Sequence, residues 1–115
     1  MHYILLTITV LVMFYILSSE DTQPTGVVRI KKRYHRNDMI KEEIPYNAKG
    51  QIHGIYRFWH DNGCLQLKAR FKNGELNGLC QKFDSRGRLI KEITYKNGAV
   101  AKEKLYPNPA YAYCG

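Results

Sequence analysis

The sequence predicts a mainly β protein, an antiparallel meander of β-hairpins preceded by one N-terminal hydrophobic helix. The first observation is a period: glycines recur every 24 residues, at Gly26, Gly50, Gly74 and Gly98. A fixed interval in this range is a signature of repeat architecture. The second is alternation of apolar and polar residues between the glycines, as in residues 55–59 and 92–95, which suits half-buried strands. The third is an uncharged, apolar N-terminus.

Residues 1–19 contain no Asp, Glu, Lys or Arg. A helix of this length spans about 28 Å, close to the ~30 Å hydrocarbon core of a bilayer. We therefore expect an uncleaved membrane anchor. The alternatives are a cleaved signal peptide and a buried core helix. A signal peptide would carry a basic start and a small-residue cleavage site, and neither is well formed here.

The side of the membrane stays open. Lys and Arg follow the apolar segment closely and none precedes it, which favours a cytoplasmic body under the positive-inside rule. Apolar N-terminal segments of small proteins are, on the other hand, often export signals. We expect a membrane-associated protein, or an exported one if the segment is cleaved.

The rest of the chain divides into a linker at residues 20–26, a repeat domain at 27–105 and a Pro- and Tyr-rich tail at 106–115. The chain has 115 residues and a formal net charge of +8. This length allows one small domain with a thin core and excludes a multidomain enzyme.

Three repeat units share aromatic, aliphatic and aromatic positions six residues apart. Two units match well, and a degraded third precedes them with one extra residue before Gly50; after Gly98 the pattern fades into a cap. The matching triplets are Trp59, Leu65 and Phe71; Phe83, Leu89 and Tyr95; and Tyr34, Ile40 and Tyr46.

Each unit is interpreted as a β-hairpin because Asn-Gly pairs follow the strands. Asn62-Gly63, Asn73-Gly74 and Asn97-Gly98 are signals for type I′ turns, in which both central residues need a positive φ. Arg86-Gly87 takes the equivalent place in the later repeat, and Asn37-Asp38 in the degraded one. The glycines assigned to repeat turns are Gly50, Gly54, Gly63, Gly74, Gly78, Gly87 and Gly98.

This combination resembles the MORN-repeat variant, and more narrowly the bacterial YwqK-type proteins. The residues that carry the resemblance are the Gly-x-Leu-x-Gly start (Gly74 to Gly78), the x-Asn-Gly-x-Leu turn and the aromatic-Lys-Asn-Gly end (Phe71 to Gly74). The resemblance covers about residues 27–105. It implies a β-repeat fold and, through the YwqK-type proteins, a role as an antitoxin that contacts a partner protein, a toxin.

Catalytic and metal-binding signals are poor, so we expect no enzyme activity, no metal and no cofactor. His60 and Cys64 flank a turn and no further ligand has zinc-site spacing. Cys80 is interpreted as a plain strand residue, and Asp61 and Asp84 as turn residues. Three cysteines leave at least one unpaired within a monomer.

The candidate partner-binding residues are Tyr56, Arg57, Phe58 and Trp59. A single sheet has two faces and few residues to cover them, and Trp and Tyr are enriched where partners bind. The alternative is that these aromatic residues form only the hairpin core. On this basis we expect a non-catalytic module that binds a protein partner.

The basic segment offers a second function, as a membrane-surface scaffold. Near a membrane, each Lys or Arg gains about 1 kcal/mol from anionic lipid. The alternatives are a solvated strand face and nucleic-acid binding, which is disfavoured because acidic residues interrupt the basic track. The candidate lipid-contact residues are Arg29, Lys31, Lys32, Arg33 and Arg36.

Overall fold

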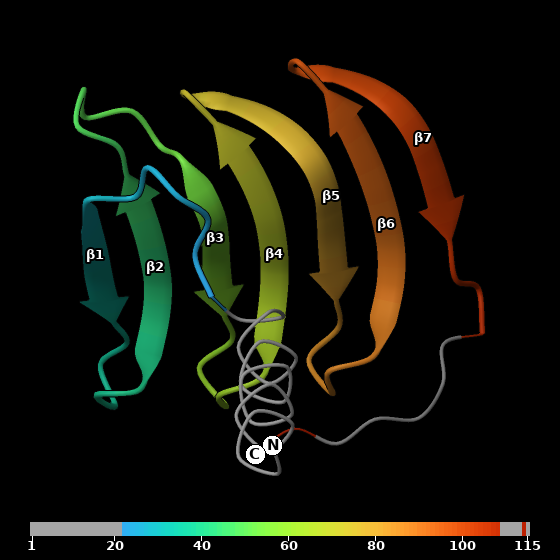
Figure 1. Ribbon diagram of the computed structural model, residues 1–115. Coiled ribbons are helices and arrows are strands. Elements are labelled where there is room, and N and C mark those ends of the chain that lie inside the picture. The colour runs from blue at the N-terminus through green and yellow to red at the C-terminus, as the bar shows by residue number, and fades with distance from the viewer. Residues whose placement is uncertain (1–21, 109–113, 115) are drawn as a thin grey trace, which may run out of the picture.

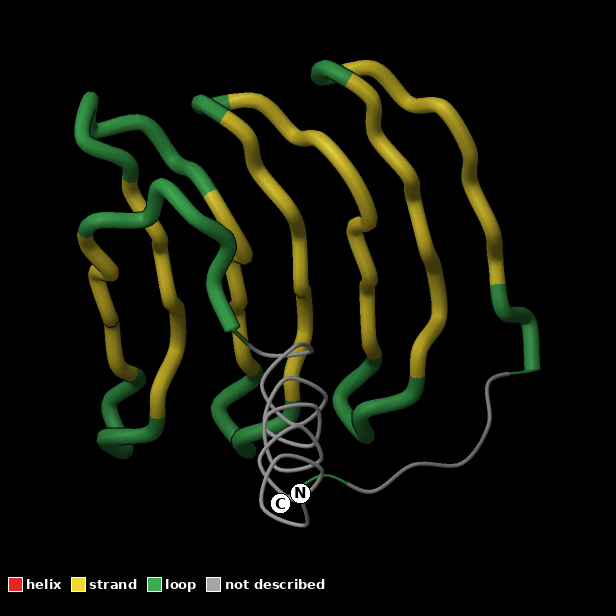
Figure 2. The backbone as a smooth tube through the Cα atoms, viewed as in Figure 1, coloured by secondary structure: helices red, strands yellow, loops and turns green. Residues whose placement is uncertain are grey.

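A computed structural model describes residues 22–108 and Cys114. The described chain folds into one open sheet of seven strands in the order β1-β2-β3-β4-β5-β6-β7 (Figure 1). Each strand pairs antiparallel with its neighbour in sequence, which confirms the predicted meander (Figure 2). The predicted N-terminal helix lies outside the described residues. The strands are β1 (Arg29–Tyr34), β2 (Ile40–Tyr46), β3 (Gly54–Trp59), β4 (Leu65–Lys72), β5 (Glu75–Phe83), β6 (Leu89–Lys96) and β7 (Ala99–Leu105).

Two of the predicted Asn-Gly turns are type I′ turns. Asn73 and Gly74 have φ of 49° and 89°, and Asn97 and Gly98 have φ of 50° and 85°. Asn tolerates the left-handed region better than most residues, and glycine enters it freely. These two-residue turns join β4 to β5 and β6 to β7 at the upper end of the sheet in Figure 1.

The turns at the opposite end are longer, and the type I′ prediction for Asn62-Gly63 is wrong. Only Gly63 has a positive φ there, because the turn is longer than a two-residue connection: the His60 amide donates to the Cys64 carbonyl, and the Gly63 amide donates to the His60 carbonyl. Residues 84–88 form the same turn. Residues 35–39 do so as well, with Asp38 at φ 64° in the glycine position.

Gly54 and Gly78 lie in strands and not in turns. Gly54 begins β3 and Gly78 lies within β5, both with a φ above 110°. A Cβ on Gly78 would stand 3.1 Å from Arg70 Cδ, and one on Gly54 would stand 2.5 Å from Gln23 Oε1. Glycine is therefore required at these positions by backbone conformation and by a close neighbour, and the hairpin ends lie elsewhere.

Neighbouring repeats are joined through their turns as well as through their strands. The amide of Gly74 donates to the carbonyl of Ile52, and the amide of Gly98 donates to that of Leu76, both at 2.8 Å. At the other end, Asn62 Nδ2 donates to the carbonyl of Ser85. The repeats therefore stack in a fixed register.

The sheet has two different faces, because successive strand residues point to opposite sides. One face holds the buried cluster Ala69, Cys80 and Ile93, which occupy directly opposed positions on β4, β5 and β6. We call it the aromatic face, after the half-buried residues that surround the cluster: Tyr56, Leu67, Phe71, Leu76 and Tyr95.

The opposite face carries most of the charged strand residues, and we call it the charged face. Residues 22–28 cross it in front of β2 and β3 (Figure 1). The Gln23 side chain pairs with the backbone of Ile55 through two hydrogen bonds of 2.7 and 2.8 Å, as a neighbouring strand would. The described part of the predicted linker is thus packed on the sheet.

Within residues 22–108, no helix has the length and apolar character required to span a membrane.

Replacing Gly74 with Val tests the turn that sets the β4–β5 register. A β-branched residue in the left-handed region costs at least about 1–2 kcal/mol, so the free energy of unfolding should fall by that amount. Asn73→Gly is the matched control and should change it by less than about 0.5 kcal/mol, because glycine adopts the same φ without strain. Urea denaturation of the full chain measures both, and equal stability of the two variants would contradict the turn assignment.

Candidate functional site

The aromatic face is organised around Tyr56 and Phe71, whose rings meet edge to face with centroids 6.0 Å apart. Tyr56 lies opposite Ala69 in the β3–β4 register, so its ring stands beside the buried cluster. Phe58 lies two residues further along β3, opposite Leu67. These rings cover a thin core and remain half-buried, so they present apolar surface on the outside of a single-layer sheet.

A buried carboxylate anchors one side of this face. Glu42 is only 9 % exposed and pairs with Arg33 at 3.5 Å. Burial, together with the charge of Glu42 and a hydrogen bond to it, raises the pKa of Tyr56 to about 12. The Tyr56 hydroxyl therefore stays protonated and acts as a hydrogen-bond donor at neutral pH.

The four residues expected to bind a partner do not form one surface. Tyr56 and Phe58 point to the aromatic face, whereas Arg57 points to the charged face and pairs with Glu43 at 3.3 Å. The reason is the two-residue period of a strand, which separates neighbours onto opposite faces. Trp59 lies beyond a register shift at the end of β3, opposite Leu65.

The basic segment forms the edge strand β1, and all six of its residues are exposed. Arg29, Lys31 and Arg33 share the side of the aromatic face, where Arg29 stacks over the Tyr46 ring at 4.6 Å. Lys32 points to the other side, and Arg36 lies in the following turn. The alternation thus divides the predicted lipid-contact residues between the two sides of the sheet.

Cys64 and Cys114 form a disulfide that ties the C-terminal tail to the β3–β4 turn. Their Cα atoms are 5.2 Å apart, and Cys64 is 2 % exposed. The Cys114 side chain lies against Gly87 in the next turn, where a Cβ would stand 2.7 Å from its sulfur. Cys80 keeps a free thiol, buried in the core cluster, and burial raises its pKa.

The C-terminal tail is also held by contacts of Tyr106, its first residue. The Tyr106 hydroxyl donates a hydrogen bond to Glu92, and this bond holds the pKa of Glu92 below its ordinary value. Lys104 stands 4.8 Å above the Tyr106 ring. Residues 105 and 106 are thereby fixed against β6.

The turn carboxylates serve the backbone. Asp84 accepts hydrogen bonds from the amides of Arg86 and Arg88, and the Arg88 amide is the main cause that lowers the pKa of Asp84. In the described part of the chain, no group of three or more His, Cys, Asp and Glu residues is placed to hold a metal ion. Cys64 is engaged in the disulfide and so does not pair with His60 as a ligand.

Two basic residues of β4, Lys68 and Arg70, were missed by the sequence analysis. They line a cavity of about 240 Å³ on the charged face, together with Ile55, Leu79 and Gln81. The sequence did contain a signal for Lys68. When the extra residue before Gly50 is taken into account, Lys68 aligns with Glu43 of the preceding repeat and with Glu92 of the following one. The Cys64–Cys114 pairing had no such signal, because it joins a turn to a distant tail.

The comparisons with known proteins agree with the repeat pattern. A family model described as MORN repeat variant matches residues 30–48, 52–73 and 76–97, which together make up more than half of the chain. No curated protein and no solved structure matches the chain significantly.

The disulfide predicts a definite thiol count. Alkylation of the denatured, unreduced protein should modify one cysteine, Cys80, and alkylation after reduction should modify all three. The Cys64→Ser/Cys114→Ser variant should lose about 2–4 kcal/mol of unfolding free energy. Reductant should destabilise the native protein similarly and leave the variant unchanged. Mass spectrometry that finds three free thiols without reduction would exclude the disulfide.

The Tyr106–Glu92 hydrogen bond predicts a pH effect. A carboxyl group whose pKa is lowered by folding stabilises the fold above its unfolded pKa, and this contribution is lost as pH falls through the folded pKa. Tyr106→Phe should raise the pKa of Glu92 and weaken that acid dependence, whereas Tyr34→Phe, at an exposed site, should change neither. NMR titration of the Glu92 carboxyl carbon measures the pKa, and an unchanged value in Tyr106→Phe contradicts the contact.

Proposed function

Since the chain belongs to the MORN repeat variant family, we propose that it is a non-catalytic repeat module that binds a partner protein on its aromatic face. The observation that carries this proposal is the single layer: within the described residues all seven strands belong to one sheet, and each strand is hydrogen-bonded to its sequence neighbours. The half-buried rings of the aromatic face therefore lack a second layer of described strands or helices. Tyr and Phe on such a surface favour binding to a partner.

The apolar surface also continues to the edge of the sheet. On β7, Val100 lies opposite Tyr95 and Leu105 opposite Lys91, and both are more than half exposed, at 58 % and 64 %. Exposed apolar side chains beside an aromatic surface extend the area that a partner can cover. Lys82 lies on the same face and favours a partner with an acidic group at the rim of its binding surface, whereas the opposed Lys91 already pairs with Glu103 at 2.8 Å.

The kind of partner follows from resemblance. The repeat pattern is similar to that of YwqK-type proteins, a family of antitoxins. An antitoxin that neutralises a toxin by direct contact needs a binding surface and no catalytic group. We therefore take a toxin as the leading partner. Tyr56 and Phe58 provide the apolar contact, while Arg57 belongs to the opposite face and is left out of it.

The location that we propose is a body outside the cytoplasm, tethered or released by the N-terminal segment. The Cys64–Cys114 disulfide supports this side of the membrane, since structural disulfides persist in oxidising compartments and are rare in the cytosol. A cleaved N-terminus would give an exported protein with the same sheet.

The alternative function is a membrane-surface scaffold that binds anionic lipid through β1. The exposure of Arg29, Lys31, Lys32 and Arg33 on this edge strand favours it. Two of these cations already have carboxylate partners, Arg33 with Glu42 and Lys32 with Glu43. These ion pairs reduce the charge available to lipid, so we place the lipid function second.

Affinity capture of the full-length protein from detergent-solubilised cells, with two matched variants, tests the proposal. Leu105→Ser changes an exposed residue of the aromatic face, and Val28→Ser changes an equally exposed residue outside it, 64 % against 66 % exposed. Recovery of a stoichiometric partner should fall about tenfold with Leu105→Ser, as expected for an interface residue worth ~1.4 kcal/mol. Phe58→Ala should lower it further, with the fold checked by thermal melting.

Two outcomes would reject the aromatic face. One is equal recovery from all variants, and the other is loss with Val28→Ser alone. If no protein is recovered and the full-length protein binds anionic vesicles with an affinity that falls steeply with salt, the lipid function replaces the first proposal.

A further inference from the structure

One row of side chains crosses the whole charged face. Each member lies directly opposite the next in the strand register, from β1 to β7. The members, in order, are Lys32, Glu43, Arg57, Lys68, Gln81, Glu92 and Lys104. Directly opposed residues of opposite charge stabilise a sheet, and like charges destabilise it.

The alternation of charge in this row breaks at Lys68. Its neighbours across the strands are Arg57 on one side and the uncharged Gln81 on the other. The equivalent positions in the flanking repeats are acidic, Glu43 and Glu92. A cation therefore stands where the repeat pattern provides a carboxylate, beside another cation.

The acidic residues nearest to Lys68 along this row are engaged elsewhere. Glu43 pairs with Arg57 at 3.3 Å and with Lys32 at 3.9 Å. Glu92 accepts hydrogen bonds from Tyr106 and from Gln81. Within the described residues, no ion pair joins Lys68 or Arg70 to a carboxylate.

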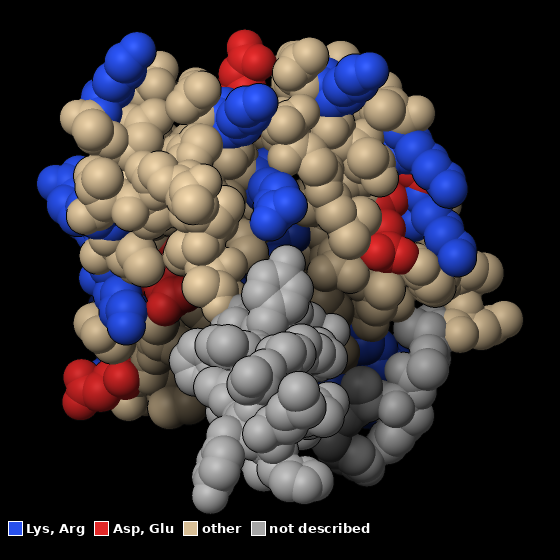
Figure 3. All heavy atoms as spheres, in the orientation of Figure 1, with Lys and Arg blue, Asp and Glu red and all other residues tan. Residues whose placement is uncertain are grey.

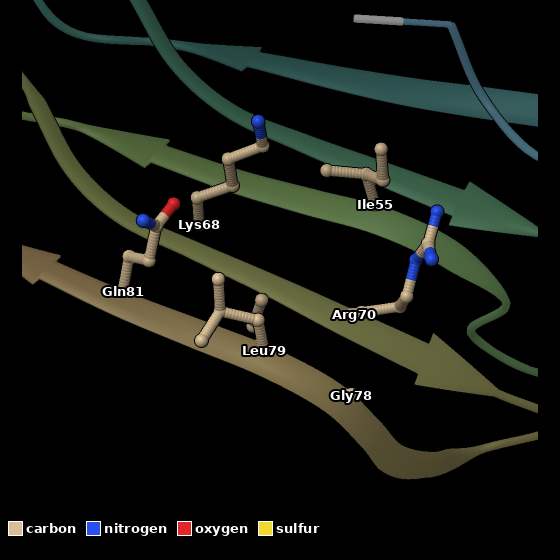
Figure 4. Close-up of a pocket in the computed structure, with 7 residues that line it drawn as sticks. Ile55, Lys68, Arg70, Gly78, Leu79 and Gln81 are labelled. Atoms are coloured by element: carbon tan, nitrogen blue, oxygen red, sulfur yellow. The ribbon is translucent and has the colours of Figure 1, made fainter. Parts of the chain in front are cut away.

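Arg70 lies two residues beyond Lys68, on the same side of β4. Its side chain extends over Gly78, and the missing Cβ leaves room for it. Figure 4 shows Lys68, Arg70 and Gln81 standing on the same side of the strands as Ile55 and Leu79. Leu79 is 43 % exposed although its neighbours on this face are mainly charged.

These side chains line the cavity of about 240 Å³. Its chemistry is a guanidinium and an ammonium, an amide, and two branched aliphatic side chains. In the parts of the charged face that Figure 3 leaves visible, basic side chains are spread among fewer acidic ones, so the surroundings also favour an anion.

We propose that this cavity binds a small aliphatic monocarboxylate. The carboxylate lies between Lys68 and Arg70, where the planar guanidinium can donate two parallel hydrogen bonds. The branched hydrocarbon end contacts Ile55 and Leu79. Binding would place a negative charge beside Lys68, at the position where the flanking repeats carry Glu43 and Glu92.

A single negative charge suits the site better than a phosphate dianion. Gln81 Nε2 donates to Glu92 at 3.2 Å, so an ionised carboxylate stands next to the cavity. The Glu92 carboxylate offsets part of the positive charge of Lys68 and Arg70. It would therefore repel a bound dianion more strongly than a bound monoanion. The ligand can be a free acid or the carboxyl terminus of a peptide that ends in Leu, which has the same chemistry.

The test is a ligand-observed NMR titration of 4-methylpentanoate with the full-length protein in neutral detergent. Lys68→Gln/Arg70→Gln should weaken binding at least about tenfold, since it removes two charge-assisted interactions. Lys102→Gln/Lys104→Gln is the matched control. It removes the same charge on the same face, beside Glu92, and should leave the affinity within about twofold.

The neutral analogue 4-methylpentanamide should bind at least about tenfold more weakly than the acid. Acetyl-Ala-Leu, compared with its amide, distinguishes a peptide terminus from a free acid, and preference for either carboxylate supports the site. Equal binding by the two double variants, or tighter binding of butyl phosphate, would overturn the proposal. Because the cavity is on the face opposite Tyr56 and Phe58, partner capture can succeed or fail independently of this result.

Discussion

Strand register is the constraint on which the rest of this structure depends. Every strand pairs with its sequence neighbour, so the turn between two strands and the register shifts within them set how the strands align. The type I′ turns at Asn73-Gly74 and Asn97-Gly98 allow two residues and no more. A slip of one residue would move every side chain of a strand to the other face. The buried cluster of Ala69, Cys80 and Ile93 exists only because three strands keep the same register.

The same register gives the two faces different chemistry. The aromatic face buries Ala69, Cys80 and Ile93 at its centre and leaves aromatic rings half-buried around them. The charged face carries a row of side chains in which most cations have an acidic neighbour. Its one interruption, at Lys68, coincides with a cavity that has two aliphatic walls. One alternation rule therefore produces two surfaces of different chemistry on opposite sides of the sheet.

A single sheet of this size has a thin core. Long-range interactions at the C-terminal end of the chain stabilise the fold in addition to this core. Small domains bury a limited fraction of their surface, so a covalent cross-link contributes a large part of their stability. The disulfide closes a separation of 50 residues and seats Cys114 against Gly87 of the next turn. The Tyr106–Glu92 hydrogen bond fixes the tail at its other end. Gln23 plays a related role at the N-terminal side, where its amide pairs with the Ile55 backbone.

The sequence by itself determined the repeat period, the hairpins and the meander, because these depend on local turn chemistry and on alternation. Alternation along β3 also places Tyr56 and Phe58 on one face, as the register confirms, and their role in partner binding stays a prediction. The sequence failed where the answer depends on which residues meet across strands. Arg57 was grouped with Tyr56 although it points the other way, and Lys68 and Arg70 line a cavity only because β3 and β5 supply Ile55, Leu79 and Gln81. The Cys64–Cys114 pairing was decided by the tertiary structure alone, since the two cysteines are 50 residues apart and their spacing carries no signal for a bond.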